Sequence, residues 1–582
     1  MKFTFNRVKT LIVVSALSVT FIGGWFAESL IGDDYYYEVK RSLRLFGDVY
    51  KNVGEKYVDE ISPKVIMRTG IDAMLETLDP YTMFYEGSES SDLDAFMKGK
   101  YGGIGVTVGI RRNTIMVITV TEGSPAYKAG LKPGDRIVGV DGKTTRDIPI
   151  RDLSNSVKGE PGTSLKLDVK REGQSSALQM TMIREMIAIE NIPYYGVLAG
   201  DIGIIKLTKF SKTSTSDFTR ALKDLRSQGI KGLIIDLRGN PGGLLDAAID
   251  ITNQFVRKGE LITYTKGRIQ DANRSYYANN DPLIPQLPVA VLVDGNSASA
   301  SEIVSGAMQD LDRGILVGST TFGKGLVQTV YPLQERDAVL KITTAKYYTP
   351  SGRCIQREHY AHDRSNAMRL ESEDEPNEFY YDVFGEEDQV RDSLTNDSLP
   401  SKRQEFKTKT GRIVYAEGGI TPDIIKDDYS FLGYTREIVR RGYVFDFATR
   451  FSAQNTRIDT GFVPDEELLT EFYKFLKDHH FNYNSTADSQ LTALRAYAEN
   501  NGYSAQIQQS ILQLQNKFDE EEVKEFEAAK TAIRNLLQQE IISRYYGNRR
   551  RFEITLKSDP VVESARSVLK DEVLYKKILK QK

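Results

Sequence analysis

Strand-like and helix-like patterns alternate through the middle of the chain. Short apolar runs bounded by turn residues predict strands, and apolar positions three and four apart predict the helices between them. The predicted strands are 202–207, 232–237, 261–266, 289–293, 315–317 and 339–348, and the predicted helices are 214–228, 244–257 and 300–311. This alternation indicates an α/β layer structure.

Different patterns flank this region and divide the chain into several domains. Before it come a stretch with helical periodicity and then a compact β-rich stretch; after it come a polar, irregular stretch and a charged helical tail. The predicted parts are a signal or anchor segment (1–31), a helical N-terminal domain (32–99, with helical spacing from 35 to 99), a β-rich domain (100–187), an α/β core (188–357, completed by 410–430), a surface insertion (358–409) and a helical C-terminal domain (431–582).

The N-terminus has the features of a targeting segment. Three basic residues, the last of them Lys9, precede the apolar run 11–27, a pattern typical of an export signal or a membrane anchor. The bulky side chains of Trp25 and Phe26 stand where a cleaved signal prefers small residues, which favours an uncleaved anchor. With the positive end inside, the rest of the chain is expected on the exported, periplasmic side of the cytoplasmic membrane.

Charge and the scarcity of cysteine and histidine exclude several classes of function. The 582 residues carry 77 Lys and Arg against 80 Asp and Glu, a net charge of −3, which argues against a nucleic-acid partner. The one cysteine, Cys354, allows neither an intrachain disulfide nor a Cys-based zinc site. All four histidines follow residue 358. His359 and His362 lie in the insertion without an evident third ligand, so no metal or other cofactor is predicted.

The turns that follow three of the predicted strands carry the candidate chemistry. The first turn, 236–243, reads DLRGNPGG, and its glycines allow backbone N–H groups to face a ligand. Taken alone, this turn is better explained as an ordinary strand-to-helix turn, and Asp236 with Arg238 is interpreted as a polar pair that shapes it. The second turn, 294–302, reads DGNSASASE and places serines at a helix start, where the dipole favours developing negative charge. Ser299 with Glu302 also fits a capping box, with Glu302 as a cap or as a residue that positions its neighbours.

The third turn, 321–328, reads TFGKGLVQ and holds Lys324 between two glycines. It lacks the spacing of a phosphate-binding loop, so nucleotide binding is disfavoured. A lysine that extends along the surface to water is the plain alternative. A serine whose domain contains no histidine needs another base, however, and a desolvated lysine can serve. Such a lysine has to be uncharged near neutral pH, which requires a pKa well below the ordinary value. A Ser/Lys dyad is therefore the leading hypothesis.

The order of these motifs resembles that of the carboxy-terminal processing, or tail-specific, serine peptidases. The resemblance runs from Leu78-Asp79-Pro80 through the three turns and YYTPSGRCIQ to the GGITPD segment at 418–423. It implies that Ser299 is the nucleophile, that Lys324 is the base, and that Gln328, four residues on in a helical-type step, orients the lysine. The implied oxyanion donors are the N–H groups of Ala300 and of Gly242 or Gly243. A crotonase-like α/β core with an inserted PDZ domain is the implied fold.

The β-rich module resembles a PDZ domain, which binds a peptide as an added strand and holds its terminal carboxylate on loop N–H groups. The loop would be Gly103-Ile104-Gly105-Val106, and 107–110 the strand that pairs with the peptide. Leu153 and Val157, on a predicted helix 151–158, would form the other wall of the groove, unless they only pack in the core of the module. Protein or peptide substrates bound through their C-termini are the expected partners.

Three functions compete at this point. The first is an active serine endopeptidase acting on exported proteins. The second is an inert PDZ-bearing scaffold of the cell envelope, which would be expected to lack Ser299 or Lys324, although both are present. The third is an acyl-CoA enzyme on a crotonase-like core, which would not need a PDZ domain. The oligomeric state stays open, and a homo-oligomer or a regulatory partner is compatible with the sequence.

Overall fold

The structure is a computed structural model, and part of the chain lies outside the residues that it describes. The described residues are 35–111, 114–147, 156–334, 337–357, 404–416, 418–426, 433–479, 481, 483 and 485–580. The predicted signal or anchor segment, most of the predicted insertion and Leu153 are therefore outside them. The chain divides into two compact units, Met1–Asp79 and Pro80–Lys582, and each is considered by itself.

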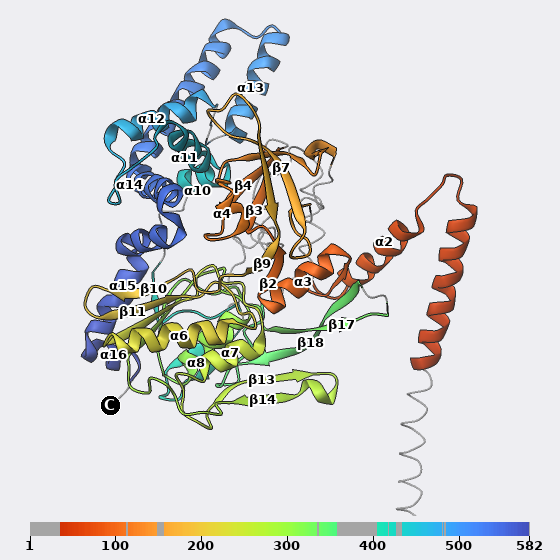
Figure 1. Ribbon diagram of the computed structural model, residues 1–582, viewed down its shortest axis with the longest axis vertical. Coiled ribbons are helices and arrows are strands. Elements are labelled where there is room, and N and C mark those ends of the chain that lie inside the picture. Colours follow the sequence, from red (N-terminus) through yellow and green to blue (C-terminus); the bar gives the residue numbers. More distant parts are fainter. Residues whose placement is uncertain are drawn as a thin grey trace, which may run out of the picture. The chain divides into compact units, whose positions relative to one another are not determined.

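The described part of the first unit is helical, as its apolar spacing predicts. Residues 35–56 form one helix, and α2 spans Pro63–Glu76 (Figure 1). The hydroxyl of Tyr50 donates to the carbonyl of Pro63 at 2.9 Å and joins the two helices. Within the described residues, no helix is both long enough and apolar enough to cross a membrane.

The second unit opens with a strand where the helical spacing predicts a helix. Met83–Glu86 forms β1 and pairs antiparallel with β18, Ala338–Tyr348. The helical prediction for 35–99 is therefore wrong at these four residues, although α3, Ser88–Lys98, is helical again. Pairing with a distant strand decides the conformation of so short a segment, because its own apolar pattern fits either structure.

The α/β prediction is confirmed by a six-stranded sheet in the order β10-β11-β12-β15-β16-β21. Its members are β10 (Tyr194–Leu198), β11 (Ile202–Lys206), β12 (Gly232–Asp236), β15 (Val289–Val293), β16 (Ile315–Gly318) and β21 (Ile424–Ile425). Only β10 is antiparallel to its neighbour. All residues of β12, β15 and β16 are buried, which explains their continuous apolar runs: both faces of a parallel sheet are covered.

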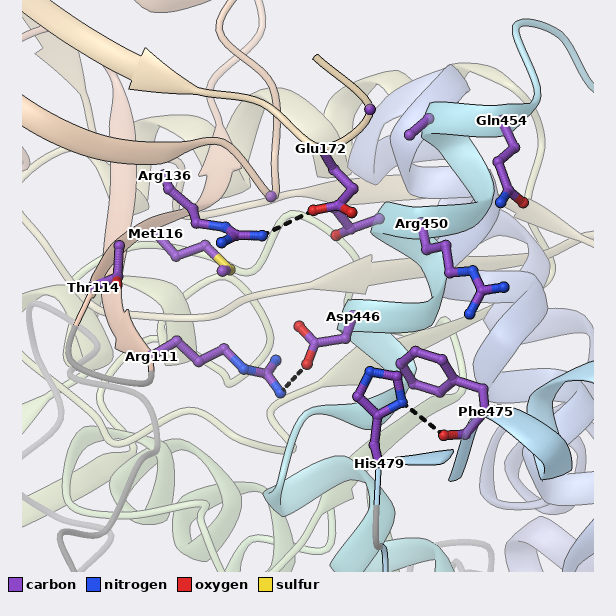
Figure 2. Close-up of a pocket in the computed structure, with 14 residues that line it drawn as sticks. Arg111, Thr114, Met116, Arg136, Glu172, Asp446, Arg450, Gln454, Phe475 and His479 are labelled. Carbon is purple, nitrogen blue, oxygen red and sulfur yellow. Dashed lines mark hydrogen bonds and ion pairs between the residues drawn. The ribbon is translucent and has the colours of Figure 1, made fainter. Parts of the chain in front are cut away.

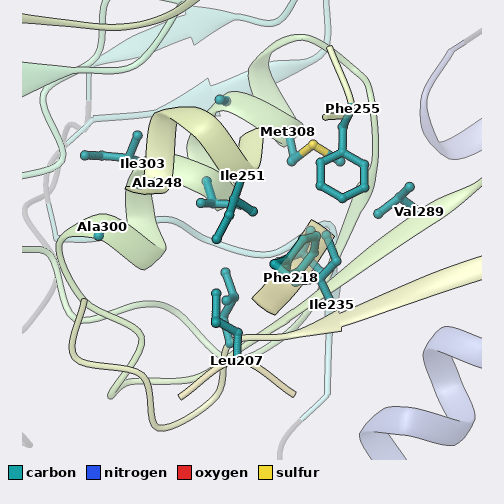
Figure 3. Packing of buried hydrophobic residues seen from close by; sticks show 14 of the residues in the cluster. Leu207, Phe218, Ile235, Ala248, Ile251, Phe255, Val289, Ala300, Ile303 and Met308 are labelled. Atoms are coloured by element: carbon teal, nitrogen blue, oxygen red, sulfur yellow. The ribbon is translucent and has the colours of Figure 1, made fainter. Parts of the chain in front are cut away.

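Helices cover both faces of this sheet. One layer consists of α6 (Ser214–Ser227), α7 (Leu245–Thr252) and α8 (Ala300–Asp310). The bounds of α6 and α8 are within one residue of the prediction, whereas α7 ends five residues before the predicted end at 257. Figure 3 shows the apolar side chains that pack between these helices and the sheet, among them Phe218, Ile251 and Met308. The other layer comes from the end of the chain, α15 (Pro560–Lys570) and α16 (Glu572–Ile578), which pack their apolar sides against the opposite face.

A second sheet lies beside the first and contains the segment after the lysine turn. Its order is β1-β18-β13-β14, with β17 also paired to β18. The strands not yet located are β13 (Leu261–Gly267), β14 (Arg274–Tyr277) and β17 (Leu326–Pro332). Gln328 thus lies on a strand, so the helical-type step from Lys324 to Gln328 is wrong.

The β-rich module has the sheet order β3-β4-β5-β7-β8, with β6 paired to β5. Its strands are β3 (Val106–Arg111), β4 (Thr114–Val120), β5 (Arg136–Val140), β6 (Lys143–Thr144), β7 (Ser164–Lys170) and β8 (Leu178–Ile183). β2 (Lys100–Gly103) and β9 (Glu185–Ala188) pair with each other at the two ends of the module. Because β3 is an edge strand, a further strand can pair with it.

The helices after residue 430 contact the β-rich module as well as the core. Besides α15 and α16, they comprise α10 (Tyr434–Arg440), α11 (Tyr443–Gln454), α12 (Glu466–Asp478), α13 (Ser485–Asn500) and α14 (Ala505–Ser558). Arg111, at the end of β3, donates to the carbonyls of Arg441 and Gly442, both at 2.9 Å, and pairs with Asp446 at 2.5 Å. A cavity of about 490 Å³ lies beside this pair, between the module and helices α11 and α12 (Figure 2).

Candidate active site

The three predicted turns meet at one edge of the six-stranded sheet. β12 and β15 pair in parallel with Asp236 opposite Leu292, and β15 and β16 pair in parallel with Val293 opposite Gly318. The carboxyl ends of these strands therefore lie side by side, and the turns that follow them do too. The cavity of Figure 2 is elsewhere: none of its lining residues belongs to these turns.

Ser299 is the N-cap of α8 and has an unusual backbone. Its φ of 52° and ψ of −111° put a non-glycine residue in the positive-φ region, which costs about 1–3 kcal/mol and is concentrated at functional sites. The residue is half-buried, whereas Ala298 and Ala300 on either side are fully buried. The serine side chain is thus displayed at a helix start from a turn that the core holds rigidly.

Glu302 ties the serine turn to the lysine turn. Its Oε2 accepts the N–H groups of Ser299 at 2.8 Å and Lys324 at 2.9 Å. Its Oε1 accepts the hydroxyl of Thr321 at 2.6 Å and the N–H of Gly323 at 2.7 Å. Burial raises the pKa of this carboxyl, but all four donors favour the charged form and oppose that shift. These contacts fit both roles considered for Glu302, a cap of the helix start and a residue that positions its neighbours.

Lys324 is buried, with only 6% of its surface exposed, so it is not a lysine that extends to water. Its Nζ lies 4.1 Å from the centroid of the Tyr81 ring, within cation–π distance. Tyr81 packs with Ala298, next to the candidate serine, and with Phe322 of the lysine turn. The amine therefore lies against an aromatic ring beside the serine turn.

Tyr347 adds a second link between the two turns. From β18, its buried hydroxyl lies 3.1 Å from the carbonyl oxygen of Ser299 and 2.8 Å from that of Lys324. Burial raises the pKa of this hydroxyl well above its ordinary value, so it stays a donor. The sequence predicts no role for Tyr347, Tyr81 or Thr321, although Thr321 begins the third turn and Tyr347 begins the YYTPSGRCIQ segment, because only the fold shows what these side chains contact.

The Gly-rich turn approaches the serine closely. A Cβ on Gly242, whose φ is 106°, would lie 2.9 Å from the Ser299 Cβ and 2.9 Å from the Ala300 nitrogen. A Cβ on Gly243, whose φ is 139°, would lie 2.1 Å from the Phe210 carbonyl oxygen. Both positions therefore require glycine.

The hydrogen bonds of this turn distinguish the candidate oxyanion donors. The N–H of Gly242 donates to the Asn240 side chain at 2.9 Å and is already engaged. The N–H groups of Gly243 and Ala300 donate to no atom of the residues that the structure describes. Of the two alternatives for the second donor, Gly243 therefore fits better than Gly242.

The Asp236–Arg238 pair shapes this turn, as the sequence indicates. Both carboxylate oxygens of Asp236 accept from the Arg238 guanidinium, at 3.0 and 2.8 Å. Lys206 also donates to Asp236 at 3.1 Å. Burial alone would raise the pKa of Asp236, but the charges of Arg238 and Lys206 outweigh it and hold that pKa well below its usual range.

Gln328 has a side-chain contact with the neighbouring strand. Its Nε2 lies 3.5 Å from the Oγ1 of Thr343 on β18. Thr343 in turn lies near Thr82, one residue after Tyr81. The role of orienting Lys324, which the resemblance implies for Gln328, stays a prediction.

The predicted peptide-binding loop lies directly before the edge strand β3. Gly103 ends β2, Ile104 is buried, and Gly105 has a φ of 79°. The N–H groups of Ile104 and Gly105 donate to no atom in the described ranges, while the Ile104 carbonyl accepts the N–H of Ala126 at 3.0 Å. Val106 and Val157 are both buried in the core of the module. For Val157, packing in the core is the alternative to a place in the wall of the peptide groove. Leu153 lies outside the described residues, as do His359 and His362.

Comparison with known proteins identifies the family. Residues 201–365 match Peptidase family S41, 116–171 match a PDZ domain, and 434–569 match a C-terminal helical domain of a probable PDZ-protease. The carboxy-terminal-processing protease of Bartonella bacilliformis is 38% identical over 320 residues, which cover 54% of this chain and 73% of the relative. The chain belongs to this family of carboxy-terminal processing proteases.

Further relatives of this processing protease have the same description. The carboxy-terminal processing protease CtpA of Bacillus subtilis is 30% identical over 358 residues, which cover 61% of this chain and 75% of the relative. The solved photosystem II D1 C-terminal processing protease is 28% identical, with 54% of this chain and 89% of that one covered and a TM-score of 0.32. The family matches and the two curated relatives show that the protein is a serine-type peptidase with a PDZ domain.

Replacing Glu302 by Gln in this peptidase should disconnect the two turns. The amide keeps one acceptor oxygen but turns an NH₂ group toward donors, so at least two of the four hydrogen bonds are lost. We expect the free energy of unfolding to fall by about 2–4 kcal/mol and kcat to fall at least about tenfold. Chemical denaturation and steady-state proteolysis measure the two effects. Glu89→Gln in α3 is the control. Unchanged turnover in Glu302→Gln would show that catalysis does not need the hydrogen bonds by which Glu302 joins the two turns.

Proposed function

We propose that this peptidase uses Ser299 as its nucleophile and Lys324 as its general base. The observation that carries the proposal is the shared contact of the two residues with Glu302 and Tyr347, which brings a strained helix-start serine beside a buried lysine. No histidine precedes residue 359, which favours a base other than histidine. An amine in an apolar setting loses its proton more easily than one in water, because burial disfavours the charged form.

The reaction follows from these positions. The Ser299 Oγ attacks the carbonyl carbon of the scissile bond while the uncharged Lys324 amine takes its proton. Negative charge develops on the carbonyl oxygen and is stabilised by the free N–H groups of Gly243 and Ala300, at the N-terminus of α8. Lys324 then gives the proton to the leaving amine. Attack by a water molecule on the acyl-enzyme, with Lys324 again as the base, releases the carboxylic acid and restores Ser299.

Lys324→Arg distinguishes a base from a fixed charge. A guanidinium keeps the positive charge but does not deprotonate at accessible pH, so we expect peptide cleavage to fall at least about a thousandfold. Ser299→Ala should abolish both cleavage and labelling by a fluorophosphonate, whereas Lys231→Arg, at an exposed surface pair, should leave both unchanged. Wild-type kcat/KM should rise with pH across the neutral range, as the amine loses its proton. Near-wild-type cleavage by Lys324→Arg would assign the lysine an electrostatic role instead.

We propose that the PDZ domain binds the free C-terminus of the substrate. Support comes from the unused N–H groups of Ile104 and Gly105 and from the open edge of β3, next to which a peptide can add as a strand. Binding there raises the local concentration of substrate near Ser299. Exported proteins with apolar or small C-terminal residues are the proposed substrates.

A substrate with an amidated C-terminus should be cleaved markedly more slowly than the same peptide with a free carboxylate. The amide removes the charge that the loop N–H groups bind, so the effect should be mainly on KM. Paired assays of the two peptides measure it, with fluorophosphonate labelling of Ser299 as the control for an intact site. Equal cleavage of the two would mean that the PDZ domain does not read the terminal carboxylate.

The N-terminal segment supports one further proposal, attachment to the cytoplasmic membrane with the protease on the exported side. It depends on the basic flank and the apolar run 11–27 of the sequence. Full-length protein should sediment with membranes and be released by detergent. Recovery of a soluble form whose N-terminus lies near residue 28 would contradict the anchor.

A further inference from the structure

The C-terminal helix α15 begins next to the Gly-rich turn of the candidate active site. Its N-cap, Asp559, is 8% exposed. One carboxylate oxygen, Oδ1, accepts the N–H groups of Val561 at 2.9 Å and Val562 at 3.1 Å. The other, Oδ2, lies 2.7 Å from Nη2 of Arg238. A single side chain thus caps the helix and holds an arginine of the Gly-rich turn.

Arg238 belongs to a buried network whose charges balance. Its guanidinium contacts Asp236 and Asp559, and Lys206 contacts Asp236, so two cations face two carboxylates. The Arg238 N–H also donates to Asp236 at 3.0 Å, which fixes the backbone of the turn as well as the side chain. Loss of the Asp559 charge would leave an unbalanced positive charge in a desolvated place, and the arginine would have to move toward water.

The backbone that follows Arg238 is joined to the serine turn by hydrogen bonds. The N–H of Gly239 donates to Asp294 at 3.0 Å. The carbonyl of Asn240 accepts the N–H of Ala298 at 3.0 Å and the hydroxyl of Ser301 at 2.8 Å. A displacement of Arg238 is therefore transmitted both to Gly243, further along the same turn, and to the segment that displays Ser299.

We propose that Asp559 is a positioning residue of the peptidase: it fixes Arg238 and thereby holds the Gly243 N–H where the oxyanion of the reaction forms. The proposal rests on the function proposed above for Ser299 and Gly243. Asp559 lies far from the other active-site residues in sequence and touches no substrate atom in this scheme. The start of α15, near the end of the chain, is then part of the active-site framework, and the negative charge of Asp559 contributes to turnover.

Asp559→Asn tests this role without removing the helix cap. Asparagine is as good an N-cap as aspartate, but its amide cannot balance the Arg238 charge. We expect kcat on a quenched fluorescent peptide with a free apolar C-terminus to fall about tenfold, with KM within about twofold. Binding of a peptide boronate, which forms a tetrahedral adduct at the serine, should weaken by a similar factor. Glu563→Gln, which removes a more exposed ion pair from the same helix, is the matched control and should match the wild type.

A double-mutant cycle separates positioning from general destabilisation. If Asp559 acts through Arg238, Asp559→Asn should have almost no further effect on kcat in an Arg238→Gln background. Asp559→Ser, a second good cap, should reproduce the loss, and the melting temperatures of both Asp559 variants should stay within a few degrees of the wild type. Independent, additive effects, or unchanged kcat in both Asp559 variants, would overturn the proposal. Wild-type protein whose Ser299 is not labelled by a fluorophosphonate would refute the proposed function itself, and this inference with it.

Discussion

The candidate site depends on the parallel pairing of β12, β15 and β16. Parallel neighbours end at the same edge of a sheet, so the pairing of the strands itself brings together turns that are distant in the chain. The pairing brings the turns together but does not fix their relative positions to the precision that catalysis needs. Glu302 does this, because each of its carboxylate oxygens accepts at least one N–H group of the lysine turn.

Glu302 and the proposed base Lys324 are both buried but need different surroundings. The carboxylate needs hydrogen-bond donors, whereas a base needs surroundings that favour the uncharged amine. A charged Glu302 without exposure to water is tolerable because four donors surround it. The Lys324 amine instead lies over the Tyr81 ring, which packs with Ala298 and Phe322. The backbone N–H groups of Gly323 and Lys324 satisfy the acid, while the Lys324 side chain extends to the Tyr81 ring.

The sequence predicts this site well where the signal is local and poorly where it is not. Apolar runs identify the buried strands, and the motifs at 236–243, 294–302 and 321–328 identify the turns, because each depends on residues next to one another. Tyr347 lies in the YYTPSGRCIQ segment and Tyr81 follows Leu78-Asp79-Pro80, but neither has a local signal for its contacts: they lie near the serine only after β17 and β18 have paired and the chain from Pro80 has returned to the core. The error at Gln328 has a related cause, since a spacing of four residues fits one face of a strand as well as one face of a helix.

The end of the chain shows why composition alone does not define a domain. Its charge and helical periodicity suggest a separate C-terminal domain, and α10 to α13 are consistent with that interpretation. The strands of the core, however, are apolar on both faces, while α6 to α8 cover only one of them. A second layer is therefore required, and α15 and α16 supply it with the apolar residues Val561, Val562, Ala565, Val568 and Leu569. A helix that packs centrally on β12 and β15 must start near one end of those strands, and α15 starts where the turn after β12 begins. Its cap can then meet Arg238, so the same packing that completes the core also brings a carboxylate from the end of the chain to the active-site turn.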